Sequence, residues 1–430
     1  MGAEGWSARL GERLFEHFER GRGDRTAHVY GPGLQSLATS ARQFAASVAP
    51  YVAAADRASS AQEIEELARE VLKLAARAGW LTRFLPRWVG GESGLRALQR
   101  HGSMPTLVWI EELAAVSPGL ATLLGAHYLG AMPILLSFDF ALQRRVLAPL
   151  CDRLHCGDVA ICAFAITEPG AGSDVEDALG ARTARLVTTA RRVAGGYVLN
   201  GRKCFISGGN LASLTTVFAA LEPERTVQSW TCFAVSMDAP GVEVVRVEDK
   251  MGQRLSPAAE LCFHDVFVPL AYRVGPERQG WHLNRATLDL SRPLVGALAL
   301  GGARTALEEA FRWAEHHGLL SDRYFQHELA RLIGAYAAAH ALVVRAARVV
   351  PPLADLSAMA KFVATDTAMS IVSAVMNWLG LEATLVGSTV ERLYRDIRLT
   401  QIYEGTNEIN RLVVFEKLRS GRPLCWPEGV

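Results

Sequence analysis

The spacing of apolar side chains changes twice along this chain of 430 residues, and this constrains the fold more than any other feature. From about residue 41 to 158 the chain is rich in Ala and Leu at helical spacing, as in Ile64, Leu67 and Val71. From about residue 159 to 272 it changes to short apolar or alternating runs rich in Val, Thr, Phe and Cys. A helix face repeats every three or four residues and a strand face every second residue, so a helical segment precedes a β segment.

Helical spacing returns beyond residue 272, where Gly318, Pro351 and Gly380 separate the periodic stretches. These stretches are residues 281–317, 325–349, 354–379 and 389–400. The predicted fold class is therefore mainly α with a central β domain. Its predicted divisions are an N-terminal extension at 1–40, an N-terminal helical domain at 41–158, a middle β domain at 159–272 and a C-terminal helical domain at 273–430.

Charge and cysteine content exclude several classes of function. The 45 basic and 44 acidic residues give a net charge of +1, so neither nucleic acid nor an anionic membrane surface is an expected partner. Seven cysteines without a CxxC pair indicate neither a disulfide framework nor a metal site, and we expect a cytoplasmic location. We find no run of about 18 apolar residues, so no membrane insertion is expected.

The segment Tyr403-Glu404-Gly405-Thr406 interrupts two helical stretches near the carboxyl end and offers a single carboxylate. Gly405 tolerates a left-handed backbone, Thr406 can cap the next helix, and Glu408 suits the first turn of that helix. Such a segment is an ordinary turn between helices, or it presents Glu404 as a base to a neighbouring cavity. Turn chemistry alone favours the first interpretation.

A second segment, residues 164–174, runs from a predicted strand into a loop of small residues, Thr-Glu-Pro-Gly-Ala-Gly-Ser-Asp. Its backbone N–H groups can approach a planar ring or a pyrophosphate closely, with Thr167 and Ser173 as hydroxyl donors. Pro-Gly and Gly-Ser are also common turn formers. The chain has neither GxGxxG nor a Walker lysine, so a Rossmann or P-loop site is not indicated.

A third segment, residues 200–209, places Phe205 two positions before Ser207 on a predicted strand. The two side chains then share a face, where Phe205 can pack on a flat ring while Ser207 donates to its polar edge. The alternative is an ordinary half-buried strand, which an isolated F-x-S pattern favours.

Together the three segments resemble motifs of the acyl-CoA dehydrogenase family. Further matches follow in the same order along the chain: residues 250–254, 263–269, 289–292, 360–361 and 391–396. The resemblance covers nearly the whole chain from about residue 41. It implies an N-terminal helical domain, a small β-barrel domain and a C-terminal four-helix bundle.

The resemblance implies an FAD enzyme that removes the α proton and the β hydride of an acyl thioester, with Glu404 as base and flavin N5 as hydride acceptor. The residues implied to bind FAD are Phe164, Ile166, Thr167, Gly172, Ser173, Phe205, Ser207, Thr406 and Glu408. Those implied to bind the substrate are Ser173, Asp289, Arg292, Tyr403 and Gly405. Asp289 and Arg292 are equally consistent with a common i, i+3 surface pair on a helix.

The implied partners are an acyl-CoA or acyl-carrier thioester, and an electron-transfer flavoprotein or similar acceptor. The assembly is a homodimer, a homotetramer, or a heteromer with a related subunit. Family segments that reach a neighbour's FAD are eroded at residues 317–321 and 377–383. Weakened FAD binding, a compensating intact subunit and lost redox function all fit this erosion. The alternative functions are a flavin oxidase or monooxygenase on the same scaffold, and a non-catalytic subunit.

Overall fold

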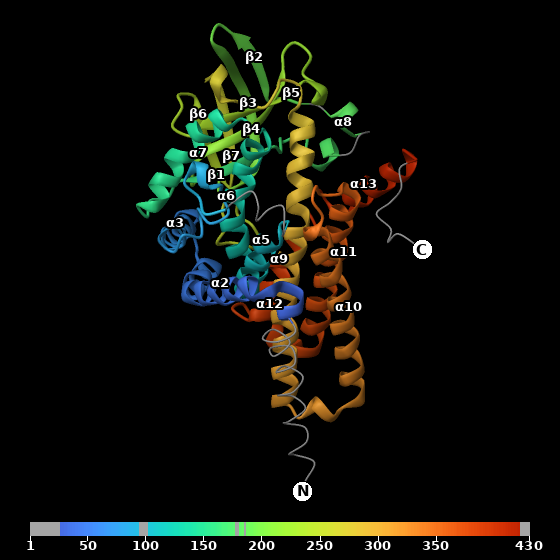
Figure 1. Ribbon diagram of the computed structural model, residues 1–430. Helices are drawn as coiled ribbons and strands as arrows, with labels where there is room; N and C mark the ends of the chain where they lie inside the picture. The colour runs from blue at the N-terminus through green and yellow to red at the C-terminus, as the bar shows by residue number, and fades with distance from the viewer. Residues whose placement is uncertain (1–25, 94–101, 177–179, 185, 422–430) are drawn as a thin grey trace.

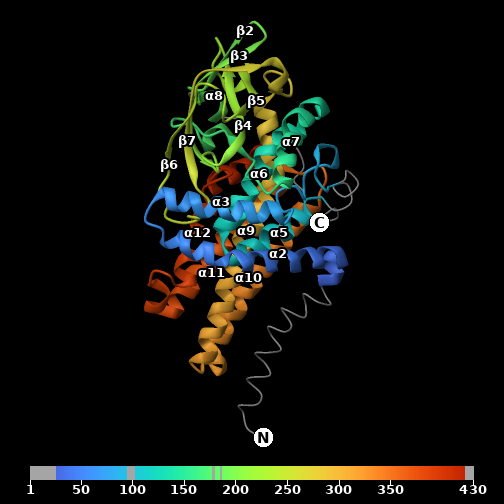
Figure 2. The same ribbon diagram turned by 90° about the vertical axis from the view of Figure 1, so that its left-hand side faces the viewer.

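The structure is a computed structural model, and it describes residues 26–93, 102–176, 180–184 and 186–421. A helical layer and a β domain lie at one end of a long helical bundle (Figure 1). The N-terminal helices are α2 (Thr26–Arg57), α3 (Ala61–Arg77), α5 (Met104–Val116), α6 (Pro118–Leu136) and α7 (Phe140–His155). They lie across the upper part of the bundle when the molecule is turned by 90° (Figure 2).

Helix α2 crosses the boundary that we predicted at residue 41. Its buried side chains Leu37, Ala41, Ala45 and Val48 follow one helix face and join the N-terminal core. The boundary was predicted there because the first 40 residues are of mixed polarity and show no clear helical period, yet the helix begins at Thr26 and includes Pro32. Residues 1–25 of the predicted extension lie outside the described part of the chain.

Helix α6 is buried on nearly all sides, as expected of a helix that is apolar all round. Pro118 occupies its first turn, and the Ser117 hydroxyl caps it by accepting a hydrogen bond from Leu120 N at 3.3 Å. His127 joins this helix to the first strand: its Nδ1 accepts from Cys162 N at 3.0 Å and its Nε2 donates to Leu81 O at 2.9 Å. Burial lowers the pKa of His127 to about 4, so the ring stays neutral in this role.

In the described part of the chain, three helical stretches are long and apolar enough to cross a membrane by length and composition: α6, Arg323–Arg348 and Ala354–Thr384. Our criterion of a strictly apolar run missed α6 because Thr122, His127 and several glycines interrupt it. In the most apolar 18-residue stretch of α6, 67% of the residues are buried inside the protein. They are buried because α6 packs against α5, the helix Gly280–His316 and the β domain. The absence of membrane insertion stays a prediction.

Within the described residues, the β domain is one sheet of eight strands in the order β6-β7-β3-β2-β4-β5-β8, with β1 paired to β4. The longer strands are β1 (Ile161–Ala165), β2 (Thr189–Val193), β3 (Gly196–Ser207), β4 (Ala212–Leu221), β5 (Trp230–Ser236), β6 (Val242–Val247) and β7 (Ala258–Pro269), and β8 is Arg273–Val274. Strand β1 runs parallel to β4, whereas β3 and β7 form a long antiparallel ladder. The loop after β1 and the end of β3 carry two of the predicted motifs.

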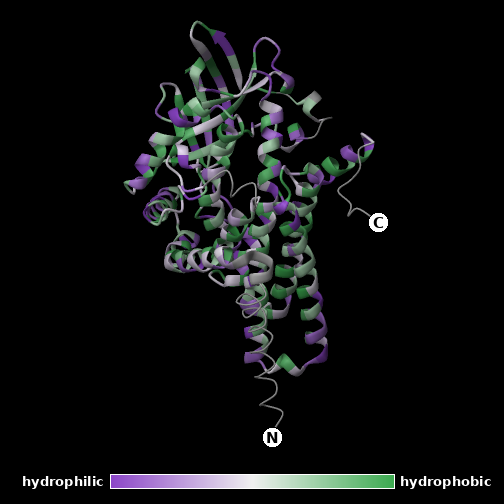
Figure 3. Cartoon of the chain, in the orientation of Figure 1, coloured by the Kyte–Doolittle hydropathy of each residue, from purple (hydrophilic) through white to green (hydrophobic). Residues whose placement is uncertain are grey.

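The C-terminal domain consists of long antiparallel helices. They are α9 (Gly280–His316), α10 (Arg323–Arg348), α11 (Ala354–Leu379), α12 (Thr389–Thr400) and α13 (Asn407–Arg419). The bounds of the first four agree with the predicted stretches to within two residues. Helix α9 runs from the β domain through the bundle and packs against α5, α6, α10, α11 and α12 (Figure 1). The bundle end where α9 and α10 meet is hydrophilic (Figure 3).

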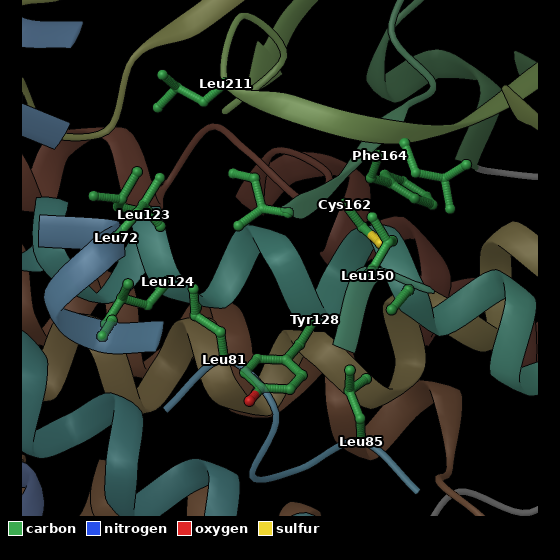
Figure 4. Close-up of a cluster of buried hydrophobic side chains, with 14 of the residues drawn as sticks. Leu72, Leu81, Leu85, Leu123, Leu124, Tyr128, Leu150, Cys162, Phe164 and Leu211 are labelled. Atoms are coloured by element: carbon green, nitrogen blue, oxygen red, sulfur yellow. The ribbon is translucent and has the colours of Figure 1, made fainter. Parts of the chain in front are cut away.

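The N-terminal helices and the β domain share one apolar core. Figure 4 shows part of it, where Leu81, Leu124 and Tyr128 face side chains that reach down from the sheet. Phe164 of β1 belongs to this core, and its ring lies 5.3 Å from that of Phe218. This packing fixes the end of β1, and hence the start of the loop that follows it, against the helical layer.

Candidate active site

The structure brings two of the predicted motifs together. The loop after β1 ends in a short helix, η3 (Ser173–Glu176), and the turn between α12 and α13 lies directly beside it. The Thr406 N–H donates a hydrogen bond to Ser173 Oγ at 3.2 Å. Thr406 also caps α13, because its hydroxyl accepts from Ile409 N at 3.3 Å. The predicted cap is therefore confirmed, and it is joined to the small-residue loop.

The turn that carries Glu404 is held in a left-handed conformation. Glu404 has a φ of 54° and Gly405 a φ of 82°. A left-handed conformation costs a residue other than glycine about 1–2 kcal/mol, and such strain clusters at functional sites. Buried Lys361 holds the turn, since its ammonium donates to Gly405 O at 2.9 Å and to Asn407 Oδ1 at 2.7 Å. The turn is thus a fixed element of the structure.

Glu404 is half-buried. Its carboxylate accepts a hydrogen bond from the Ser291 hydroxyl on α9. Arg292, the next residue, donates from Nε to the main-chain oxygen of Glu404 at 3.4 Å. Burial raises the pKa of Glu404 to about 7, against the lowering effects of Ser291 and Arg292. A carboxylate with this pKa is a suitable proton acceptor near neutral pH.

Arg292 is the centre of a buried charge cluster. Its Nη1 lies 3.2 Å from Asp289 Oδ1 and its Nη2 lies 3.1 Å from Glu176 Oε2. The Arg292 side chain is 1% exposed, so the interpretation of Asp289 and Arg292 as a surface pair is wrong. Burial raises the pKa of Asp289 and the pKa of Glu176, in each case against the effect of Arg292.

A second buried ion pair joins the predicted segments at residues 164–174 and 200–209. Lys203 Nζ lies 2.9 Å from Glu168 Oε1, and both side chains are fully buried. Lys203 also donates to Ile166 O at 2.8 Å, and Glu168 accepts from Val187 N at 2.6 Å. Burial lowers the pKa of Lys203 against the effect of Glu168. This pair fixes the loop after β1 against strand β3.

Phe205 and Ser207 lie on the accessible side of β3, with buried Ile206 between them. The strand is not regular here, because Phe205 has a φ of 58° and the register with β7 shifts between Lys203 and Ile206. A β-bulge of this kind redirects a side chain. The Phe205 ring is 61% exposed, so it is available to pack against a ligand.

Thr167 lies beside this bulge, since its main-chain oxygen accepts a hydrogen bond from Cys204 N at 2.9 Å. Among the described residues, neither the Thr167 hydroxyl nor the Ser207 hydroxyl has a hydrogen-bond partner. An exposed aromatic ring with two free hydroxyls nearby fits a flat heterocycle with a polar edge, such as the isoalloxazine of FAD. The residues present therefore fit the cofactor that we predicted.

The chain as a whole matches known proteins. Residues 32–153, 163–266 and 278–418 match, in that order, the N-terminal, middle and C-terminal domains of acyl-CoA dehydrogenases. The chain belongs to the acyl-CoA dehydrogenase family. As a member it is a flavoprotein by family and an oxidoreductase acting on CH–CH bonds.

Relatives match over most of their length. Cyclohexane-1-carbonyl-CoA dehydrogenase of Geobacter metallireducens is 32% identical over 372 residues, which are 85% of this chain and 93% of that protein. Butyryl-CoA dehydrogenase of Megasphaera elsdenii superposes with a TM-score of 0.78 at 30% identity, covering 90% of this chain and 98% of that one. A chain of the electron transferring flavoprotein structure of Acidaminococcus fermentans gives a TM-score of 0.79 at 30% identity, with the same coverages.

The remaining predicted site residues of this family member occupy different positions. Phe164 is buried in the core, so only its main chain can face a ligand, whereas Ile166 is half-buried. Gly172 is half-buried, and its N–H donates to Asp174 Oδ1 at 2.7 Å. Glu408 is exposed in the first turn of α13, as predicted. Their roles toward FAD stay predictions.

Sequence reasoning missed several residues that shape the site. Glu176 was not predicted, nor was Ser291, nor the positioning role of Lys361. Gln253 was also missed. Its Nε2 donates to the Tyr403 hydroxyl at 3.2 Å and to Asp396 O at 2.8 Å, so it links the turn to helix α12. The family match at residues 250–254 was the one available signal for Gln253.

The two eroded segments of this acyl-CoA dehydrogenase lie at the ends of bundle helices. Leu381 is 78% exposed and Glu382 is exposed too. Ala383, the last residue of the second segment, is instead fully buried in the C-terminal core, so its side chain cannot obstruct the approach of a neighbouring cofactor as Leu381 and Glu382 can. Residues 317–321 include the short helix η6 (Leu319–Ser321), in which half-buried Leu319 and Leu320 pack against the C-terminal core.

The raised pKa of Glu404 predicts a pH-dependent stability. Between its ordinary pKa of 4.5 and its folded value of about 7, the folded chain holds a proton that the unfolded chain has lost. The resulting stability is therefore present below about pH 4.5 and is lost as the pH rises to about 7, by about 3 kcal/mol. Glu404→Gln should remove this dependence, so urea unfolding at about pH 8 should show the variant gaining stability relative to wild type, with the gain vanishing near pH 4. An equal difference at both pH values would contradict the assignment.

Proposed function

We propose that this family member is an FAD-dependent dehydrogenase of acyl thioesters, in which Glu404 removes the α proton of the acyl group. The observation that carries the proposal is the environment of the Glu404 carboxylate. It lies in a fixed left-handed turn, accepts from Ser291, and has a pKa near 7.

The turn offers a second group for this chemistry. A C–H bond α to a thioester is a weak acid, so negative charge that develops on the carbonyl oxygen must be stabilised by donors. Among the described residues, the Glu404 main-chain N–H donates no hydrogen bond within the protein. It is free to donate to the thioester carbonyl while the side chain of the same residue takes the proton.

FAD, when bound, supplies the acceptor for the hydride that leaves the β carbon. The chain would hold it through the exposed Phe205 ring, the free hydroxyls of Thr167 and Ser207, and the loop of Ser173, with Thr406 and Glu408 nearby. The flat ring would pack on Phe205, while the hydroxyls would bind polar edges. Closure of the site would exclude water and keep Glu404 basic.

The proposed substrate is a thioester of CoA or of an acyl carrier. In this proposal its acyl group or thiol arm lies near Asp289, Arg292, Tyr403 and Gly405. The electron acceptor is an electron-transfer flavoprotein or a similar protein, a proposal supported by the likeness to the Acidaminococcus fermentans chain. A cytoplasmic location belongs to the same proposal. The assembly is a homodimer, a homotetramer, or a heteromer in which an intact related subunit compensates for the erosion at residues 317–321 and 377–383 and completes FAD binding.

The proposal is tested by the colour of the purified protein. The holoprotein should be yellow, and anaerobic addition of one member of a panel of straight, branched and cyclic acyl-CoA thioesters should bleach it. Yellow that persists with every thioester would favour an oxidase or another substrate, and a colourless protein that takes up no FAD would favour a non-catalytic subunit. A full complement of FAD in a homo-oligomer would contradict the heteromer.

A further inference from the structure

We propose that Glu176 is a positioning residue for the base: it binds the Arg292 guanidinium and balances a charge that would otherwise act on the Glu404 carboxylate. This inference rests on the proposed function, in which Glu404 is the base. Glu176 ends the short helix η3, three residues after Ser173. It therefore links the small-residue loop to the charge cluster on α9.

The guanidinium of Arg292 has three neighbours, each on a different side. Its Nη2 meets Glu176 Oε2 at 3.1 Å, its Nη1 meets Asp289 Oδ1 at 3.2 Å, and its Nε faces the main-chain oxygen of Glu404 at 3.4 Å. The two carboxylates direct the cation toward the backbone of the base. The Glu404 carboxylate accepts its hydrogen bond from the Ser291 hydroxyl instead of from Arg292.

The Glu176 side chain also fits against the turn itself. A Cβ atom at position 405 would overlap Glu176 Oε2, so the carboxylate lies directly against the turn and a side chain at this position would displace it. Both charged partners are withdrawn from water, with Glu176 7% and Arg292 1% exposed. A charge pair in such a place acts strongly on its neighbours, because water screens it little.

The charged and titratable groups that face Glu404 come from every element packed around it. They are Arg292 and, behind it, Asp289 on α9, Lys361 on α11, Glu176 on η3 and Tyr403 in the turn. Arg292 and Lys361 lower the pKa of Glu404, whereas Glu176 raises it. The cluster holds three carboxyl groups, the Arg292 cation, and Lys361, whose pKa is lowered by burial to about 7. Removal of Glu176 therefore leaves Arg292 less balanced and makes Glu404 a weaker base.

The test substitutes Glu176→Gln, which keeps the shape and an acceptor for Arg292 but removes the charge. The titration of Glu404 is read without substrate, from the difference in melting temperature between the protein with Glu404 intact and its Glu404→Gln variant across about pH 4 to 9. This difference grows above about pH 4.5, where the unfolded chain has lost the Glu404 proton and the folded chain still holds it, and it levels off above the folded pKa of about 7. In the Glu176→Gln background we expect the levelling to occur about one pH unit lower.

Matched variants separate charge from packing. Glu176→Asp keeps the charge, so its levelling pH should stay within a few tenths of a unit of wild type, and this comparison stands even if Glu176→Gln does not fold. Glu328→Gln removes a half-buried carboxylate on α10 that pairs with Arg331, and it should shift nothing. An unchanged levelling pH in Glu176→Gln, or an equal shift in Glu176→Asp, would overturn the proposal.

The melting experiment uses no thioester, so it separates this inference from the proposed function. Suppose that none of the thioesters bleaches the wild-type protein, while Glu176→Gln still shifts the levelling pH. The charge balance at Arg292 then stands and the dehydrogenase proposal fails. In an active holoprotein, the acid limb of the pH profile for flavin reduction should shift by the same amount in Glu176→Gln. A merely structural role would lower the rate at all pH values without moving that limb.

Discussion

Glu404→Gln is expected to lower the rate of anaerobic flavin reduction by an acyl-CoA by a factor of about 10² to 10⁴ or more. The amide keeps the size of the side chain and can still accept the hydrogen bond from Ser291, but it cannot take a proton. The main-chain N–H of residue 404 is also retained, so substrate binding should persist. Stopped-flow absorbance of the flavin band measures the rate directly.

The control for this variant is its ability to bind FAD and ligand. Its FAD content and the spectral change on ligand binding should match those of wild type, which would show that only the chemical step is lost. Near-normal flavin reduction in Glu404→Gln would mean that another group takes the proton. The candidates would then lie on α9, where Asp289 is the carboxyl that belongs to the cluster.

Lys203→Met is expected to destabilise the protein by about 3–5 kcal/mol, the largest change in stability that we predict. The substitution leaves Glu168 as an unpaired carboxylate in a fully buried position. It also removes the donor to Ile166 O, and so releases the loop after β1 from β3. Denaturant unfolding of the apoprotein, followed by circular dichroism, measures the loss.

Two comparisons sharpen this result. Lys203→Met combined with Glu168→Gln removes the uncompensated charge, so the double variant should recover much of the lost stability. Lys73→Met breaks an exposed pair with Glu70, at 2.6 Å, and should change stability by about 1 kcal/mol or less. A loss for Lys203→Met as small as that for Lys73→Met would show that the buried pair does not hold the loop.

Sequence periodicity located the C-terminal helices well, because each is long and bounded by a clear break such as Gly318 or Gly380. The same reasoning failed at α2, where Pro32 lies inside a helix. It also missed the bulge at Phe205, because the register of β3 against β7 depends on pairing between strands that neither segment's own pattern shows. Local pattern therefore predicted the elements but not their irregularities.

The site was predicted where its chemistry is local and missed where it depends on distant contacts. The Thr406 cap, the glycine after Glu404 and the small-residue loop are all readable within a few residues. Glu176 and Arg292 are 116 positions apart, and nothing in either segment identifies the other as a partner. Such pairs become visible only when the domains are packed together.

Removal of an α proton by Glu404 is tested most directly by exchange with deuterium. A thioester such as 3,3-dimethylbutyryl-CoA has α hydrogens but no β hydrogen, so proton removal can proceed without hydride transfer. The holoprotein in D₂O should introduce deuterium at its α carbon, detected by mass spectrometry, and Glu404→Gln should not. Equal exchange by both proteins, or none by wild type with a thioester that it binds, would contradict the account.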